Sequence, residues 1–172
     1  MLMKIPQIID PIMEWIAKVV KWLILIIALI NFYEVLMRYA FGSPSMWAYD
    51  VSYMLGGSFF TLGMGYTLLK GKHVRIDVFY VKLKRKTQAF LDMVLTSLLF
   101  FPTFGLLLYK LIPWVITSWE RKEKASGSYW LPPIYPLKTV LLIAVILLIL
   151  QAISEFFKDL HTFTGNEKED AR

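Results

Sequence analysis

The sequence predicts an all-α integral membrane protein in which four transmembrane helices form two hairpins behind an amphipathic N-terminal lead-in. Apolar residues make up 57% of the 172 residues and the mean hydropathy is positive, which exceeds the usual content of a water-soluble domain of this length. The apolar residues gather in four runs, and helices joined by short turns cannot hide that much apolar surface in a small soluble core. We expect residues 1–172 to form a single membrane domain, with spans at about 22–41, 47–69, 88–116 and 137–157.

Composition also excludes several classes of function. The chain has no cysteine, which excludes disulfides, thiolate catalysis and cysteine-based metal sites. The net charge of +6 would suggest a nucleic-acid partner in a soluble protein, but here the positive residues lie in the connections between apolar runs. Attraction to anionic membrane lipid explains this pattern, so we expect lipid and no nucleic acid as a partner.

The lead-in covers residues 1–21 and has no small-residue cleavage site of the kind that ends a signal peptide. Aliphatic residues recur in it at helical spacing, with charged residues elsewhere around the turn. Two interpretations remain open: a helix that lies on the inner membrane surface, or an extension of the first span. The aliphatic residues are Ile5, Ile9, Ile12, Ile16 and Val19, and the charged ones are Asp10, Glu14, Lys18 and Lys21.

The first span, 22–41, carries one polar stripe. Asn31, Glu34 and Arg38 lie within about 60° of one another around a helix. Charges that face lipid are costly, so we expect the stripe to face protein. It is either a local pair near the outer interface or a contact with a partner subunit. We expect Arg38 to pair with Glu34, with Asp50 across the turn, or with both.

The second span, 47–69, is rich in small residues, and Ser52, Gly56, Gly63 and Thr67 share one face. Small residues let helices approach closely, so packing is a better explanation than a substrate cavity.

The connection at 70–86 contains seven Lys and Arg residues, which predicts a cytoplasmic loop. Four spans then place both termini in the cytoplasm, with thirteen positive residues inside and six outside.

The third span, 88–116, contains two prolines, and we expect a kink near Pro102 and a break near Pro113. The fourth span, 137–157, is almost entirely aliphatic, and the charged tail at 158–172 has the composition of a disordered end. Aromatic residues around the outer segment between these spans suggest an interfacial belt, made of Trp114, Trp119, Tyr129, Trp130 and Tyr135 together with Trp47 and Tyr49.

Four motifs in order resemble the small membrane subunit, of DctQ type, of tripartite ATP-independent periplasmic (TRAP) transporters. The likeness covers about residues 20–158, and the family often has glutamate where this chain has Asp50. The motifs are Asn31-x-x-Glu34-Val35-x-x-Arg38-Tyr39-x-Phe41, Pro44-x-x-Trp47-x-x-Asp50, Gly71-Lys72-His73-Val74-Arg75-Ile76-Asp77 and Pro136-x-Lys138.

This resemblance implies a secondary transporter in the inner membrane of a bacterium or archaeon. In such a transporter a periplasmic binding protein delivers an organic anion, a large membrane subunit moves it with sodium, and the small subunit acts as a scaffold. The ion and substrate sites belong to the large subunit, so no catalytic, cofactor or metal residue is expected here. The resemblance instead implies candidate interface or structural residues, which are Asn31, Glu34, Arg38, Tyr39, Trp47 and Asp50 in the outer hairpin and His73, Arg75 and Asp77 in the inner loop.

A subunit of a membrane oxidoreductase, or another structural membrane protein, is the alternative. A b-type haem commonly needs histidines inside the spans, whereas His73 lies in a loop and His161 in the tail. One histidine and one carboxylate in His73-x-Arg75-x-Asp77 are too few for a metal site. An autonomous channel would need a continuous polar lining, which the spans lack. We therefore expect no enzyme activity.

Overall fold

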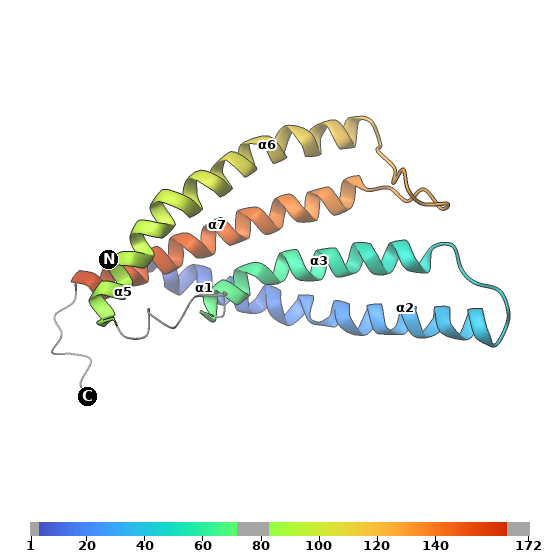
Figure 1. Cartoon of the computed structure of the whole chain (residues 1–172), viewed down its shortest axis with the longest axis horizontal. Helices are drawn as coiled ribbons and strands as arrows, with labels where there is room; N and C mark the ends of the chain where they lie inside the picture. The colour runs from blue at the N-terminus through green and yellow to red at the C-terminus, as the bar shows by residue number, and fades with distance from the viewer. Residues whose placement is uncertain (1–3, 72–82, 165–172) are drawn as a thin grey trace.

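The computed structural model describes residues 4–71 and 83–164, and this part of the chain is helical, with no β-strand. Figure 1 shows two long hairpins side by side, with α3 and α7 adjacent in the middle. Helix α7 packs on α3, α5, α6 and α1, so it is the central helix of the bundle. The elements are α1 (Lys4–Val20), α2 (Trp22–Tyr39), α3 (Ala48–Leu69), α5 (Arg85–Leu95), the π-helical turn η1 (Thr96–Phe100), α6 (Phe101–Glu120) and α7 (Tyr135–Thr164).

Three helical stretches of the described chain are long and apolar enough to cross a membrane: Ile5–Tyr39, Arg85–Glu120 and Tyr135–Thr164. Helix α3 is not among them, although its 22 residues extend about 33 Å, enough to cross a bilayer core. Its glycine, serine, threonine and tyrosine residues interrupt its apolar sequence, so it lacks the continuous apolar segment that each of these three stretches contains. The all-helical membrane class is therefore confirmed, and the fourth span remains a prediction.

Helix α1 continues into α2 with only a turn at Lys21, whose N–H still bonds to the Ala17 carbonyl at 3.0 Å. The structure thus favours extension of the first span over a separate surface helix. It adds that α1 packs on α3 and α7, with Met13 almost fully buried. Ile12 and Val19, which were expected on the apolar face, are about half exposed because the buried side of α1 is centred on Met13 and Val20.

A glycine makes the close approach of α1 to α3 possible. A Cβ added at Gly65 would lie 3.1 Å from Met13 Sδ and 3.8 Å from the Leu147 carbonyl oxygen of α7. We expect Gly65→Leu to lower the free energy of unfolding by about 1–3 kcal/mol, because the side chain would overpack a three-helix contact. Gly56→Leu is the matched control, since a Cβ there meets nothing within 4 Å. Thermal unfolding in detergent measures both, and equal stability would show that the contact is loose.

The stretch formed by α5, η1 and α6 contains the two prolines at which a kink and a break are predicted. A π-helical turn precedes Pro102, where the Phe101 N–H bonds to the Thr96 carbonyl five residues back, and Figure 1 shows the α5–α6 path arched. The predicted break at Pro113 is wrong, because α6 continues to Glu120. Pro113 is exposed, while residues on the opposite side of α6 pack against α7 before and after it and hold the helix together. Those buried residues are Leu111, Val115 and Ser118.

The expected disorder of the tail from residue 158 is also wrong in part, because α7 continues to Thr164. Two contacts explain the extension. Lys158 pairs with Asp10 of α1 at 2.7 Å, and the Phe163 ring lies 5.9 Å from the Phe90 ring of α5. Residues 165–172 lie outside the described part of the chain.

Candidate functional site

The polar stripe of the first span forms a cluster at the α2–α3 turn, which we call the outer cluster: Asn31, Glu34, Arg38, Ser45 and Ser52. Arg38 donates to Glu34 Oε1 from Nε at 3.2 Å and from Nη2 at 2.7 Å. The backbone N–H of Ser45 donates to Glu34 Oε2 at 3.0 Å, and the Ser45 hydroxyl donates to the same oxygen. Glu34 therefore binds one turn of its own helix and the chain that leads into α3.

Asn31 extends this cluster one turn deeper. Its amide donates to the Ile27 carbonyl at 2.8 Å and to the Ser52 hydroxyl of α3 at 3.3 Å. The predicted pairing of Arg38 with Glu34 is thus confirmed, and the described contact of Asp50 is different: its carboxylate accepts from the Ser128 hydroxyl in the outer loop, 121–134.

The outer cluster leaves Arg38 available for a further contact. The Arg38 side chain is 56% exposed, whereas that of Glu34 is 15% exposed. A cavity of about 270 Å³ adjoins them and is lined also by Asn31, Tyr39 and Tyr49. The Glu34 carboxylate is thus covered by its hydrogen-bond partners, whereas the Arg38 guanidinium stays accessible. This arrangement suits contact with a partner protein better than catalysis.

Trp47 and Tyr39, the two aromatic candidate residues of the outer hairpin, differ in their contacts and exposure. The Trp47 ring stacks on the Tyr33 ring of α2 with 5.8 Å between centroids, which closes the hairpin. The Tyr39 side chain is 81% exposed. Trp47 therefore has a structural contact within the chain, and Tyr39 lies on the surface beside Arg38.

A second outer contact connects α6 to α7. Lys138 is buried at the start of α7, pairs with Glu123 and lies 3.9 Å from the centroid of the Trp114 ring. The Ser118 hydroxyl donates to the same Glu123 carboxylate at 2.8 Å. The hydrogen bond from Lys138 lowers the pKa of Glu123 below its ordinary value.

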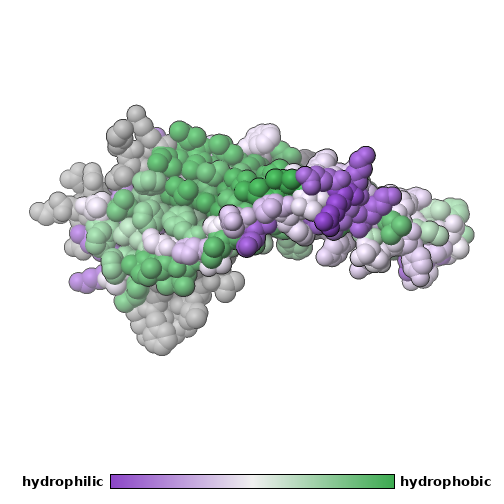
Figure 2. Space-filling model, turned by 90° about the horizontal axis from the view of Figure 1, so that it is seen from above, coloured by the Kyte–Doolittle hydropathy of each residue, from purple (hydrophilic) through white to green (hydrophobic). Residues whose placement is uncertain are grey.

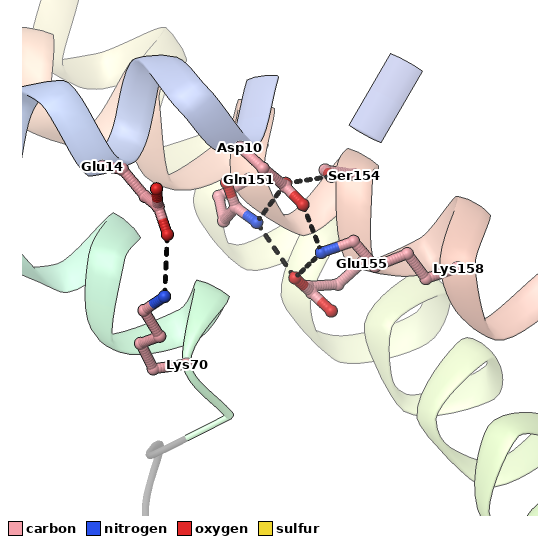
Figure 3. A network of polar contacts seen from close by, with 7 residues as sticks. All are labelled: Asp10, Glu14, Lys70, Gln151, Ser154, Glu155 and Lys158. Atoms are coloured by element: carbon pink, nitrogen blue, oxygen red, sulfur yellow. Dashed lines mark hydrogen bonds and ion pairs between the residues drawn. The ribbon is translucent and has the colours of Figure 1, made fainter. Parts of the chain in front are cut away.

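The opposite end of the bundle carries a network that we call the inner network: Asp10, Gln151, Ser154, Glu155 and Lys158 (Figure 3). Asp10 accepts from Ser154 Oγ at 2.7 Å and from Gln151 Nε2 at 3.1 Å. Lys158 Nζ lies 2.7 Å from Asp10 and 2.8 Å from Glu155. Gln151 and Ser154 are fully buried, so this network attaches α1 to the interior face of α7.

A separate ion pair attaches α1 to α3 at the same end, where Lys70 Nζ lies 2.8 Å from Glu14 (Figure 3). The bond to Glu14 raises the pKa of Lys70 above its ordinary value. His73, Arg75 and Asp77 of the predicted inner motif lie outside the described residues.

Sequence reasoning brought Asn31, Glu34 and Arg38 together correctly but did not find the inner network. A partial signal existed, because Gln151, Ser154, Glu155 and Lys158 recur at helical spacing at the end of an otherwise aliphatic run. Their partner Asp10 lies 144 positions from Ser154 in the sequence, and nothing local indicates that pairing. The described residues contain no group of three or more histidines and carboxylates that could hold a metal ion.

Comparison with known protein families matches residues 11–162 to the DctQ component of tripartite ATP-independent periplasmic transporters. The match begins within α1 and ends in the last turn of α7, and it includes the outer cluster and all of the inner network except Asp10. No curated protein matches the chain.

Proposed function

Because the chain belongs to the DctQ family of TRAP transporter components, we propose that it is the small membrane subunit that braces the large, ion-coupled membrane subunit. Polar contacts at both ends of the bundle support this proposal. The outer cluster joins α2 to α3, Glu123 and Lys138 join α6 to α7, and the inner network joins α1 to α7. These contacts hold the helices in one arrangement, as a scaffold requires.

The outward surface of the bundle supports the same role. Figure 2 shows a broad hydrophobic face, with hydrophilic residues concentrated toward one end. The helices also expose many large apolar side chains, such as Phe32 of α2 at 63% and Leu106 of α6 at 66%. A rigid apolar body fits a protein that enlarges the membrane footprint of a moving partner, since lipid and a neighbouring subunit can both cover such faces.

We further infer four membrane spans, with both termini and the 70–86 loop in the cytoplasm, on the basis of the positive charge in that loop. A cysteine in place of Tyr129, whose side chain is 98% exposed, should react with an impermeant thiol reagent added outside cells. A cysteine in place of the exposed Thr87 should react only after the membrane is opened. The reverse pattern would invert the topology, and outside labelling at both positions would contradict the single span, 88–116, that we place between them.

The proposed partners are the large membrane subunit and a periplasmic binding protein that delivers an organic anion. Sodium coupling and substrate binding are assigned to those chains. The described helices of this chain support that division, because they lack the discontinuous spans that present helix ends to a solute near the membrane midplane. The chain is proposed to act in the inner membrane as a scaffold and not as an enzyme.

Reconstitution tests this function. The large subunit and the binding protein, placed in liposomes with this chain, should take up labelled substrate along a sodium gradient, and omission of this chain should reduce uptake to background. Co-purification in detergent should show a stable complex of the two membrane subunits. Uptake by this chain alone, or full uptake without it, would refute the scaffold role. A change of substrate preference after substitution of Asn31 or Glu34 would refute it as well.

A further inference from the structure

A groove of about 360 Å³ lies where the junction of α1 and α2 meets the middle of α3. Phe59, Phe60 and Gly63 line it from α3, and Lys21 lines it from the junction. A Cβ added at Gly63 would meet no atom within 4 Å, so the space above this glycine is open. Small residues of this kind let a further helix approach closely within a membrane.

Lys21 places a positive charge among apolar residues. It lies near the centre of the 35-residue apolar stretch Ile5–Tyr39. On the other side of the groove lies Gly63, which is six residues, about 9 Å, before the end of α3 at Leu69. A charge inside an apolar layer is costly unless an opposite charge balances it, and charged residues within spans accordingly face protein and pair there.

The described part of the chain offers no carboxylate that balances this charge. Lys21 Nζ lies 5.7 Å from the centroid of the Trp22 ring, which attracts a cation but carries no net charge. Lys21 forms no ion pair among the described residues, whereas Lys70 pairs with Glu14 at 2.8 Å. Because Lys21 is exposed, a carboxylate of another chain can reach it.

The groove lies on the same side of α3 as the cavity beside Arg38. Tyr49, which lines that cavity, lies within about 60° of Phe60 and Gly63 around the helix. Gly56 lies between them on this side, and a Cβ added there would also meet no atom within 4 Å. Tyr49 and Gly63 are 14 residues, about 21 Å, apart along α3. One membrane-spanning helix is long enough to contact both cavities.

We propose that this groove receives a transmembrane helix of the large membrane subunit, which presents a carboxylate to Lys21. Gly63 lets the two helices approach closely, and the Phe60 side chain, which is 72% exposed, packs on the incoming helix. The ion pair between Lys21 and the carboxylate fixes the depth at which the two subunits meet. This inference rests on the proposed function, because the helix that fills the groove belongs to the large subunit.

Titration of the large subunit with this chain in detergent tests the site. Lys21→Met removes the charge and keeps the apolar stem, and Lys18→Met removes an exposed charge of α1 outside the groove as its control. Gly63→Leu fills the open space. Its control is Gly105→Leu of α6, because a Cβ added at Gly105 also meets no atom within 4 Å. Thermal unfolding of each isolated variant shows whether it is folded.

We expect Lys21→Met and Gly63→Leu each to weaken the complex about tenfold. The first leaves a buried carboxylate of the partner without its cation, and the second blocks the close approach of the helices. Both controls should bind as the parent does, and the isolated variants should unfold at no lower temperature than the parent. Equal affinity of parent, variants and controls would overturn the docking site and leave the proposed function intact. Failure of the parent to bind the large subunit would refute both.

Photo-crosslinking identifies the occupant of the groove without removing a charge. Benzoylphenylalanine in place of Phe60 should crosslink to the large subunit in the assembled complex. The same residue in place of Tyr109 of α6, whose side chain is 70% exposed, is the control and should not crosslink to it. A crosslink from position 60 to a second copy of this chain, or to lipid alone, would overturn the proposal.

Discussion

Replacing Lys158 with methionine is expected to lower the free energy of unfolding of the isolated chain by about 2 kcal/mol. Removal of one partner from a buried ion pair costs about 3–5 kcal/mol, whereas an exposed pair contributes under about 1 kcal/mol. Lys158 lies between these limits, with its side chain 28% exposed, and it bonds to both Asp10 and Glu155. Without it, Glu155 keeps the amide of Gln151 as a donor, and Asp10 keeps that amide and the Ser154 hydroxyl, but no cation of the inner network balances the two carboxylates.

Methionine keeps the long apolar stem of lysine, so this variant separates the loss of charge from the loss of packing. Thermal unfolding in detergent measures the change, with Lys18→Met of the exposed face of α1 as the matched control. The double variant Asp10→Asn, Lys158→Met should be less destabilised than the sum of the two single variants, because the second change removes the charge that the first left without its partner. Additive losses would show that Asp10 and Lys158 do not act as a pair.

The inner network also explains which part of the fold the sequence could not predict. Hydrophobic runs locate α2, α6 and α7 because each lies in an apolar helical stretch of 30 residues or more, whereas a bilayer core requires about 20. The same runs contain no information on how α1 lies, since its docking depends on Asp10 reaching Ser154 and Lys158 near the other end of the chain. Long-range pairing of this kind depends on the folded arrangement of helices and leaves no periodic signal.

The prolines and glycines show a second limit. Pro113 was expected to end its helix, yet a proline removes only one donor, and packing of Leu111 and Val115 on α7 offsets that loss. In α3 the small residues that allow close packing, such as Gly65 beneath Met13, also lower the hydropathy on which span assignment depends. Packing and hydropathy therefore give opposite signals for this helix, and only the fold shows that it lies beside α7.

The outer cluster, in contrast, could be predicted because its central pair is local. Glu34 and Arg38 are four residues apart on one helix, and such residues are neighbours on its surface. Of the two partners considered for Arg38, Glu34 is the one that it contacts. The hydroxyl and N–H of Ser45 donate to the other oxygen of Glu34, and Asp50 accepts from Ser128. Both serines lie in connections between helices, whose conformation the apolar periodicity does not determine.

Arg38→Ala is expected to leave the stability of the isolated chain almost unchanged. It should weaken the complex of this chain with the large subunit at least about tenfold, because an ion pair that a partner covers is far more costly to break than one in water. The reason is the asymmetry of exposure: the guanidinium is 56% exposed, so water compensates its loss in the isolated chain. Glu34 keeps both of its bonds from Ser45, which preserve the turn. In the Arg38→Ala variant, a partner subunit that covers the outer cluster would bury the Glu34 carboxylate without its cation.

The matched variant is Arg38→Lys, which keeps the charge but loses the two-nitrogen contact with Glu34. Thermal unfolding of the isolated chain and titration of the complex in detergent measure the two effects separately. Weak assembly of Arg38→Ala with partial recovery in Arg38→Lys would place the outer cluster in the subunit interface, because a purely local ion pair has no reason to affect a partner. Unchanged assembly and uptake would leave Glu34 and Arg38 with the local role alone, as a contact that closes the α2–α3 turn.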